Sequence, residues 1–336
     1  MRRVLITGGC GFLGYYLITK ITKEYPKLKI RVIDLKENPL KNFKINNKQV
    51  EIILNKDITN ENSIKDSFKD VDVVIHLAGL VSFSLKDKEK LYKVNVKGTK
   101  NVIKLSEKNK VKKFIHVSSV AALGFIDKKD SFVDENFIFD WRIAKKRQKY
   151  YMLSKYLGDK IVKSYKDKMD LLILYPGLMW GPGDIKNLVR LMIAIKQRRI
   201  PFNMPGGTNI VDVRDVAEGI VLALKKEKTG EYLLSGENHS FININKTIAK
   251  TIGTSPPRKT LPKFMNFPLF HLIKIIERIK KDLELTADNI DSSFKYRYFK
   301  NEKAKKEFGW SPKIILEKTI KDTHSWIIRE NGSLKK

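Results

Sequence analysis

The stretch TGGCGFLG at residues 7–14 follows an apolar segment, 2–7, and opens an amphipathic segment, 12–22. It contains two overlapping glycine patterns, G-x-G-x-x-G and G-x-x-G-x-x-G, which share Gly11 and Gly14. A strand, a glycine-rich turn and a helix in this order allow a pyrophosphate to approach the backbone and meet the helix N-terminus. The stretch therefore predicts a dinucleotide-binding turn between a strand and a helix.

An acidic residue stands where the second predicted strand ends. Asp34 closes the apolar run 30–34, twenty positions beyond Gly14. A carboxylate at this place can accept hydrogen bonds from the adenine-ribose hydroxyls. Its charge would repel a 2′-phosphate, which favours NAD, but Lys36 lies close in sequence and leaves NADP open. The alternative is a structural glycine turn in which Asp34 only ends a strand.

Short apolar runs alternate with longer helical patterns through the first half of the chain. The further predicted strands are 50–54, 71–76, 113–118 and 171–175, and a helix is predicted over 92–109. Strands without polar alternation are buried on both faces, and strands that alternate with helices form a parallel, doubly wound sheet. We therefore expect an α/β fold of the Rossmann type.

After residue 175 the pattern changes to Pro- and Gly-rich loops and to helices, which predicts a smaller, mostly helical C-terminal substrate domain. The short apolar run 232–235 is bounded by glycines and is expected to return to the sheet as an added strand. The predicted dinucleotide-binding domain comprises 1–175 and about 211–240. The predicted substrate-binding domain comprises about 176–210 and 241–336.

Composition narrows the class of protein. The chain has 336 residues, a formal net charge of +30 and a single cysteine, Cys10. No stretch approaches the roughly 20 apolar residues of a membrane span, and one cysteine forms neither a disulfide nor a thiolate metal site. Basic residues are scattered among acidic ones, without a basic motif interleaved with aromatic residues. We expect a cytoplasmic homodimer that binds no metal and no nucleic acid.

A tyrosine and a lysine four residues apart supply the candidate chemistry. Tyr151 and Lys155, in YMLSK, lie on one face of a predicted helix. A free tyrosine has a pKa of about 10, and a neighbouring cation favours the phenolate, so the pair is a candidate acid/base catalyst. Ser119, after the fifth strand, can donate to the same substrate oxygen. The spacing to Lys155 selects Tyr151 over Tyr150.

Together these motifs resemble the extended short-chain dehydrogenase/reductases, in particular the branch similar to dihydroflavonol reductases and 3β-hydroxysteroid dehydrogenases. TGGCGFLG, HLAG, VNVKGTKN, HVSSVAALG, YMLSK and PGLMWGPGD follow the family's order. The resemblance implies that Ser119, Tyr151 and Lys155 form the catalytic set, with the tyrosine protonating a carbonyl oxygen as hydride arrives.

The residues expected to contact the dinucleotide come from the glycine turn and from this resemblance. They are Gly8, Gly11, Phe12, Leu13, Gly14, Asp34, Asp57, Ile58, Leu77, Ala78, Gly79, Tyr151, Lys155 and Pro176.

Two places depart from the family pattern. Tyr175 precedes Pro176, where the family often has arginine. Thr208 and Asn209 stand where nucleotide-sugar epimerases and dehydratases commonly have an arginine and an aspartate, and that arginine grips the nucleotide phosphate.

The sequence therefore favours an NAD(P)-dependent oxidoreductase that interconverts a carbonyl and an alcohol on a small, apolar substrate. A nucleotide-sugar epimerase or dehydratase with tightly bound NAD is the main alternative. A non-catalytic dinucleotide-binding scaffold is a third interpretation, which the intact serine, tyrosine and lysine disfavour.

The segment 268–281, PLFHLIKIIERIKK, combines helical apolar spacing with basic residues. The apolar positions are Leu269, Leu272, Ile273, Ile276 and Ile279. A helix packed on the substrate domain explains this spacing. Peripheral contact with an anionic bilayer is the other interpretation, and it would suit a lipid-like substrate.

Overall fold

The computed structural model describes residues 1–38, 40, 43, 45, 47–280 and 285–331. Its largest sheet has seven strands in the order β10-β6-β5-β4-β1-β2-β3, and every neighbouring pair is parallel. The strands are β1 (Arg3–Thr7), β2 (Lys29–Ile33), β3 (Val50–Ile53), β4 (Val73–His76), β5 (Lys113–Val117), β6 (Asp170–Pro176) and β10 (Gly230–Leu234). The predicted doubly wound sheet is confirmed, and the run 232–235 supplies most of its added strand, β10.

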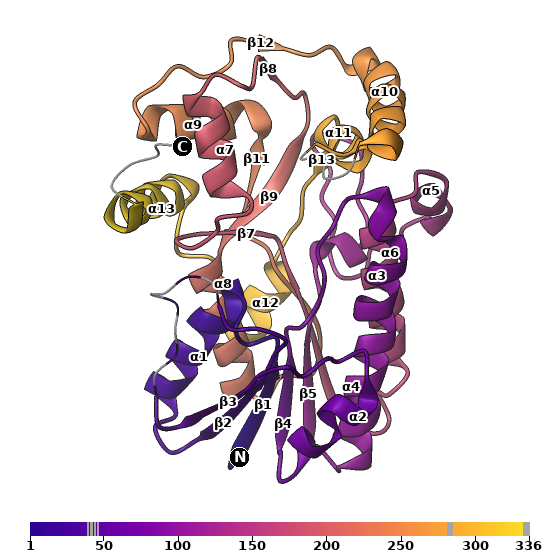
Figure 1. Cartoon of the computed structure of the whole chain (residues 1–336), viewed down its shortest axis with the longest axis vertical. Helices are drawn as coiled ribbons and strands as arrows, with labels where there is room; N and C mark the ends of the chain where they lie inside the picture. The colour runs from indigo at the N-terminus through magenta and orange to yellow at the C-terminus, as the bar shows by residue number, and fades with distance from the viewer. Residues whose placement is uncertain (39, 41–42, 44, 46, 281–284, 332–336) are drawn as a thin grey trace.

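Helices cover both faces of this sheet (Figure 1). The main ones are α1 (Phe12–Glu24) and α8 (Val213–Lys225) on one face, and α4 (Thr99–Lys108) and α6 (Tyr150–Lys163) on the other. All residues of β4 and β5 are buried as a result. The apolar strand residues thus form two cores, one with Leu17 and Ile220 and the other with Val102 and Val162.

The strand order places a crevice at the end of β1. The chain passes from β1 to β2 and β3 on one side and returns to β4, β5 and β6 on the other. Ligands of open α/β sheets bind beyond the carboxyl ends of the strands where the order reverses in this way. The turn between β1 and α1 lies at that point.

The predicted helix over 92–109 consists of three segments. They are α3 (Lys88–Tyr92), the π-helix η4 (Lys93–Gly98) and α4. In η4, the side-chain amide of Asn95 accepts from the backbone N–H of Leu80 and donates to the hydroxyl of Ser154 on α6. The apolar spacing carries no signal for π-helical hydrogen bonds, so the sequence predicted one continuous helix.

Shorter elements complete this part of the molecule. They are α2 (Glu61–Ile64), η2 (Lys65–Phe68), η3 (Leu85–Asp87), η5 (Val120–Ala122), α5 (Trp141–Lys146) and α12 (Glu302–Phe308). Ala304, Phe308 and Trp310, near the C-terminus, pack into the same core as α1 and α8.

The region after β6 contains two small sheets that the sequence analysis did not predict. In the larger sheet, β9 (Gly207–Asp212) pairs with β7 (Leu178–Trp180), β11 (Glu237–Ser240) and β13 (Tyr296–Arg297); in the smaller, β8 (Phe202–Asn203) pairs with β12 (Lys259–Thr260). The helices are α7 (Leu188–Lys196), α9 (Phe241–Thr251), η6 (Lys263–Met265), α10 (Asn266–Ile279), α11 (Ala287–Ser293) and α13 (Leu316–Asn331). β7, β8, β12 and β13 have only two or three residues, too few to show a period in the sequence. β9 and β11 contain polar residues and so do not form an apolar run. The division into two domains stays a prediction.

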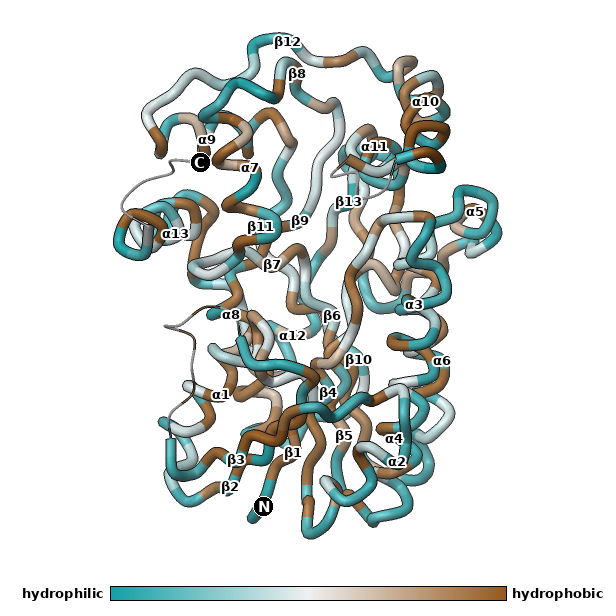
Figure 2. The backbone as a smooth tube through the Cα atoms, viewed as in Figure 1, coloured by the Kyte–Doolittle hydropathy of each residue, from teal (hydrophilic) through white to brown (hydrophobic). Residues whose placement is uncertain are grey.

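Apolar residues concentrate in the central strands and recur along α10 at the far end of the molecule (Figure 2). Within the described ranges, no helix combines the length and the apolarity needed to cross a membrane.

Candidate active site

A pocket of about 380 Å³ lies at the carboxyl ends of the central strands. All residues predicted to contact the dinucleotide or to take part in catalysis line it, except Ser119 and Pro176. The glycine turn, the end of β2, the segment after β4 and the start of α6 therefore meet in one place. This convergence of distant segments is what a dinucleotide beside a reacting group requires.

The glycine turn has no room for side chains at its critical positions. Gly8 has φ +71°, and a Cβ there would lie 2.7 Å from the backbone of Ala78. At Gly14 a Cβ would overlap the carbonyl group of Gly9. No side chain caps the N-terminus of α1, whose N-cap is Gly11, so the N–H groups of its first turn can serve an anion. The turn fits the pyrophosphate of a dinucleotide.

Asp34 follows β2 and is held against the glycine turn. Its carboxylate accepts from the backbone N–H of Cys10 at 3.0 Å and from that of Leu35 at 2.7 Å. Burial raises the pKa of Asp34, and these backbone donors oppose the rise. Lys56 lines the same pocket, which the sequence analysis missed. A cation and a carboxylate thus share the end of the pocket expected for the adenine ribose.

Helix α6 brings Tyr151 and Lys155 to the other end of the pocket. The Lys155 ammonium donates to the carbonyl of Val117 at 3.4 Å, and the Tyr151 ring packs edge-on against Phe83, with centroids 5.5 Å apart. Burial raises the pKa of Tyr151, and a hydrogen bond with the Ser119 side chain partly lowers it. The net shift is upward, whereas the sequence argument from Lys155 alone favoured the phenolate. The phenol is therefore held in its neutral, proton-donating form.

The two adjacent serines have different partners. Ser119 lies outside the pocket lining but contacts Tyr151, and its Oγ also accepts from the backbone N–H of Ala121. Ser118 lines the pocket, yet its hydroxyl donates to the buried carboxylate of Asp159 at 2.7 Å. The choice of Ser119 as the catalytic serine remains a prediction, supported by its contact with Tyr151.

Asp159, one turn beyond Lys155 on α6, joins a buried network behind the pocket. It contacts His116 Nε2 at 3.1 Å and forms a hydrogen bond with Tyr175, whose hydroxyl also donates to Glu231 at 2.6 Å. Burial lowers the pKa of Lys155, and the carboxylate of Asp159 opposes that change. Tyr175 thus takes the place of the family's arginine as a phenol between two carboxylates.

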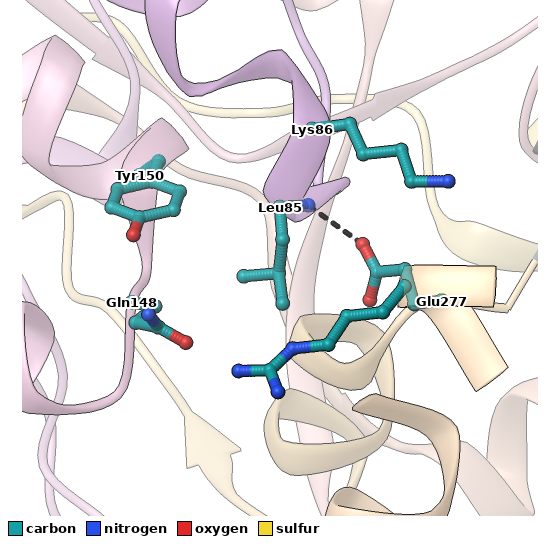
Figure 3. A pocket seen from close by; sticks show the side chains of 6 residues that line it. Leu85, Lys86, Gln148, Tyr150 and Glu277 are labelled. Atoms are coloured by element: carbon teal, nitrogen blue, oxygen red, sulfur yellow. Dashed lines mark hydrogen bonds between the residues drawn. The ribbon is translucent and has the colours of Figure 1, made fainter. Parts of the chain in front are cut away.

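Tyr150 faces a different, more open pocket of about 280 Å³ (Figure 3). That pocket is lined by Leu85, Lys86, Gln148, Tyr150, Glu277 and Arg278. Its lining includes neither the glycine turn nor Lys155. The structure therefore separates the two neighbouring tyrosines, and only Tyr151 shares a pocket with Lys155.

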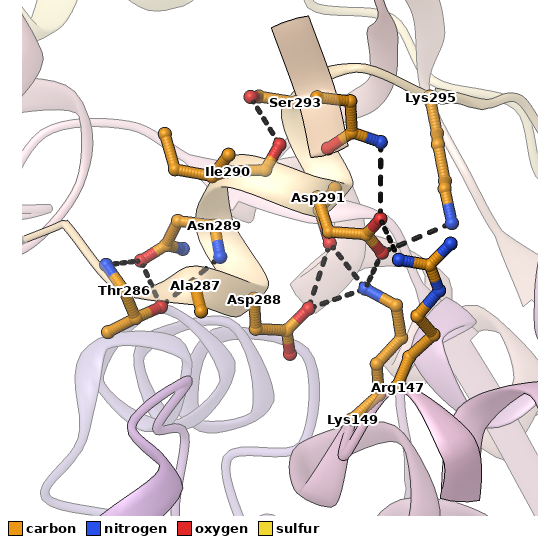
Figure 4. Close-up of polar contacts among 12 residues, drawn as sticks. Arg147, Lys149, Thr286, Ala287, Asp288, Asn289, Ile290, Asp291, Ser293 and Lys295 are labelled. Atoms are coloured by element: carbon orange, nitrogen blue, oxygen red, sulfur yellow. Dashed lines mark hydrogen bonds and ion pairs between the residues drawn. The ribbon is translucent and has the colours of Figure 1, made fainter. Parts of the chain in front are cut away.

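An ionic cluster fixes the start of α6 to the C-terminal region (Figure 4). The buried ammonium of Lys149 lies 2.6 Å from Asp288 and 2.9 Å from Asp291, both on α11. Lys295 and Arg147 also approach Asp291, at 3.1 and 3.8 Å. Because Lys149 immediately precedes α6, the cluster positions the helix that carries Tyr151 and Lys155.

Several lining residues were missed by the sequence analysis. They are Ile33, Leu35, Lys56, Leu80, Val81, Val94, Val117, Ser118 and Met179. Most are neighbours of predicted residues and could have been found by extending each motif past a strand end. Met179 lies within the motif PGLMWGPGD, in β7, which pairs with β9.

The two arginines near Thr208 differ in their partners. Arg214 forms ion pairs of 2.7 Å with both Asp212 and Asp322. Thr208 itself is buried, and its register partner is Arg297. Arg297 lies near the acidic residues Asp288 and Asp291 of α11, but within the described residues it forms no ion pair, and its Nε is buried without a hydrogen-bond partner. Of these two arginines, only Arg214 is held by carboxylates.

Known proteins resemble the chain over almost its full length. It is 25% identical over 332 residues to a putative dihydroflavonol 4-reductase of Synechocystis sp., covering 96% of this chain and 93% of the relative. It is 26% identical to a decarboxylating sterol-4-alpha-carboxylate 3-dehydrogenase of Candida albicans, covering 97% of this chain and 98% of the relative. It is also 27% identical to human dTDP-D-glucose 4,6-dehydratase, covering 98% of this chain and 91% of the relative.

The crystal structure of gox2253 has a TM-score of 0.83 and 26% identity, covering 99% of this chain and all of the other. The structure of the Bordetella bronchiseptica enzyme WbmG in complex with NAD has a TM-score of 0.75 and 20% identity. The match covers 98% of this chain and 95% of WbmG, so the two proteins share the fold. The 3-beta hydroxysteroid dehydrogenase/isomerase family matches residues 5–260. The chain therefore belongs to this family and is an NAD(P)-dependent enzyme of the extended short-chain dehydrogenase/reductase type.

Proposed function

We propose that this protein interconverts a carbonyl and an alcohol on a small, largely apolar substrate, with NAD as the preferred cofactor. The observation that carries the proposal is the single pocket shared by the glycine turn, Asp34, Tyr151 and Lys155. A dinucleotide bound along this pocket would extend from Asp34 to Lys155. That arrangement supports hydride transfer next to a proton donor.

Each end of the pocket fits a different part of the cofactor. The first turn of α1 would receive the pyrophosphate, Asp34 the adenine ribose and Lys155 the nicotinamide ribose. Asp57, Ile58 and the segment from Leu77 to Gly79 would line the remaining length. When bound, the nicotinamide supplies or accepts the hydride.

Tyr151 would act as the proton donor in the reducing direction. Its raised pKa keeps the hydroxyl protonated, and its contact with Ser119 orients that hydroxyl. Lys155 would hold positive charge near the phenol and so stabilise the phenolate left after proton transfer. The carboxylate of Asp159 would favour the charged form of Lys155.

The substrate end of the pocket is apolar. Leu80, Val81, Val94 and Met179 line the pocket together with Tyr151. Such side chains gain free energy by covering an apolar ligand and offer no partners to the hydroxyls of a sugar. This lining supports a reductase or dehydrogenase rather than a nucleotide-sugar enzyme.

The direct test is mass spectrometry of compounds released from the purified protein, followed by a screen of carbonyl substrates that monitors NADH and NADPH oxidation. We expect a nicotinamide dinucleotide in the first step and substrate-dependent oxidation in the second. Conversion of a nucleotide sugar without net change in NADH would support the alternative instead.

We expect NADH to bind more tightly than NADPH, because the carboxylate of Asp34 would lie beside the extra phosphate. Even a strongly screened repulsion of about 1.4 kcal/mol gives a tenfold difference in affinity. Fluorescence titration with each cofactor measures the two affinities. Asp34→Asn should reduce the difference between the two affinities. NADH should bind less tightly because a ribose contact is lost, and NADPH should bind more tightly because the repulsion of its 2′-phosphate is removed.

Lys56→Gln and Lys36→Gln are the matched controls, since each removes one nearby cation. Both should widen the preference for NADH. A wild-type preference for NADPH that either substitution abolishes would show that the cation, not Asp34, sets the choice.

We also expect UDP and TDP to show no saturable micromolar binding to the NAD-loaded protein. A nucleotide diphosphate must be neutralised when it is partly desolvated, and a bidentate arginine serves this best. Here Arg214 is held by Asp212 and Asp322, and Thr208 is buried and uncharged. Calorimetric titration measures the affinity for UDP and TDP. Micromolar binding would indicate that the protein is an epimerase or dehydratase.

A homodimer and a cytoplasmic location stay predictions. Sedimentation of the purified chain and fractionation of its cells would test them.

A further inference from the structure

Helix α10 is packed on one face only. Phe270, Leu269 and Ile273 join a core cluster with Ile290 and Phe294 of the α11 segment. The packed-helix interpretation therefore describes part of this helix. Two of the predicted apolar positions, Leu272 and Ile279, lie outside that core and are exposed.

The only acidic residue of α10 points inward. Glu277 is buried, and its carboxylate accepts from the backbone N–H of Leu85 at 2.6 Å (Figure 3). It also accepts from the backbone N–H of Ala287 at 3.1 Å. The carboxylate thus satisfies the start of α11 and the η3 turn. It contributes no negative charge to the outer surface of the helix.

The outward side of this segment carries large apolar side chains, which we call the α10 outer face. Its members are Phe264, Phe267, Leu272, Ile275 and Ile279, with exposed fractions of 74, 69, 52, 57 and 77%. Phe267, Ile275 and Ile279 are separated by multiples of four residues, so they lie along one side of the helix. Large exposed apolar patches on proteins commonly mark sites of interaction with other molecules.

Cations border this face. The basic residues in or next to η6 and α10 are Lys263, Lys274, Arg278 and Lys280. No ion pair with a carboxylate is found for them within the described residues. Lys263 and Lys274 instead lie over the rings of Tyr296 and Phe270. Among the described residues, this surface thus combines exposed apolar groups with basic side chains that have no carboxylate partner.

We propose that the α10 outer face docks on an anionic lipid bilayer. The apolar side chains would enter the boundary between headgroups and acyl chains, while the bordering cations pair with lipid phosphates. A second copy of the chain fits less well, since symmetric contact would bring two sets of these cations together. The proposal rests on the composition and exposure of this face, not on the proposed reaction.

The docked face would lie near the candidate active site. Glu277 binds the backbone of Leu85, and the segment leading to Leu85 contributes Leu80 and Val81 to the cofactor pocket.

The test is flotation of the full chain with vesicles of phosphatidylcholine, with and without phosphatidylglycerol. We expect flotation with the anionic vesicles, weakened by about 0.5 M NaCl because the charges are screened. The double variant Ile275→Ser with Ile279→Ser should lower the partition coefficient at least about tenfold, since each lost aliphatic group contributes about that factor. Ile315→Ser, at a 52% exposed site ahead of α13, is the control and should float as wild type.

A second measurement reports insertion directly. The only cysteine, Cys10, is buried, so a polarity-sensitive fluorophore on Ile275→Cys can be attached selectively. Its emission should shift to the blue with anionic vesicles only. Failure of the wild type to float, or equal flotation of the double variant, would overturn the proposal. Dimerisation that is lost in the double variant, without flotation of the wild type, would assign the face to a second copy and overturn it too.

Discussion

Replacing Tyr151 with phenylalanine should lower turnover about 100-fold or more while leaving cofactor binding intact. The substitution keeps the ring that packs on Phe83 and removes only the hydroxyl that would protonate the substrate oxygen. Loss of a general acid typically costs a factor of 10² to 10⁴. Steady-state turnover with a substrate from the carbonyl screen and NADH titration of the same variant measure the two quantities.

Tyr150→Phe is the matched control for this experiment. It makes the same chemical change one residue away, in a side chain that faces the pocket with Glu277 rather than Lys155. Its turnover should stay within about twofold of wild type. Full activity of the Tyr151 variant, or a larger loss at Tyr150, would refute the assignment of the proton donor.

The dependence of the reaction rate on pH tests the role of Tyr151 independently of mutation. Burial raises the pKa of its phenol, so the proton donor is present throughout the neutral range and is lost only as the pH rises through that raised pKa. Reduction should therefore hold a plateau at neutral pH. Oxidation of the alcohol needs the phenolate as base, so its rate should rise with pH over the same range.

Replacing Lys149 with methionine should destabilise the protein by about 3 to 5 kcal/mol, because it removes the cation between two buried carboxylates. Asp288 would lose its 2.6 Å cationic partner (Figure 4). Asp291 would keep Lys295, the more distant Arg147 and the side-chain amide of Asn266. Urea unfolding followed by circular dichroism measures the change. Lys104→Met is the control, since it removes a lysine from an exposed ion pair with Glu61 and should cost less than about 1 kcal/mol.

The ionic cluster around Asp291 should also affect how the stability of the protein changes at acidic pH. Burial alone raises the pKa of Asp291, but Lys149 and Lys295 outweigh burial and lower it to about 2. A lowered carboxylate pKa contributes stability that is present above the unfolded pKa and is lost as the pH falls through the folded value. Between about pH 4 and pH 2 the stability of wild type should therefore fall more steeply than that of the Lys149 variant. Equal slopes would show that Lys149 does not set the ionisation of Asp291.

The sheet and most of the lining of the candidate cofactor pocket could be predicted from the sequence, because both depend on local patterns. Strands buried on two faces appear as continuous apolar runs, and the turn after β1 needs glycine wherever a Cβ would strike backbone, as at Gly8 and Gly14. The four-residue spacing of Tyr151 and Lys155 places both on one side of α6 whatever surrounds them. Strand ends then bring these motifs together, since parallel strands share one carboxyl edge.

Which charged side chains are paired and which apolar side chains are exposed depends on contacts between distant parts of the chain. Lys149 meets α11 from 139 residues away in the chain, and Arg214 is held by Asp322 across 108 positions. Likewise α10 buries one apolar side and exposes another, although its sequence is apolar on both. Partners this distant leave no local period in the sequence, and the free energy of a buried charge or an exposed apolar group depends on its surroundings rather than on its neighbours along the chain.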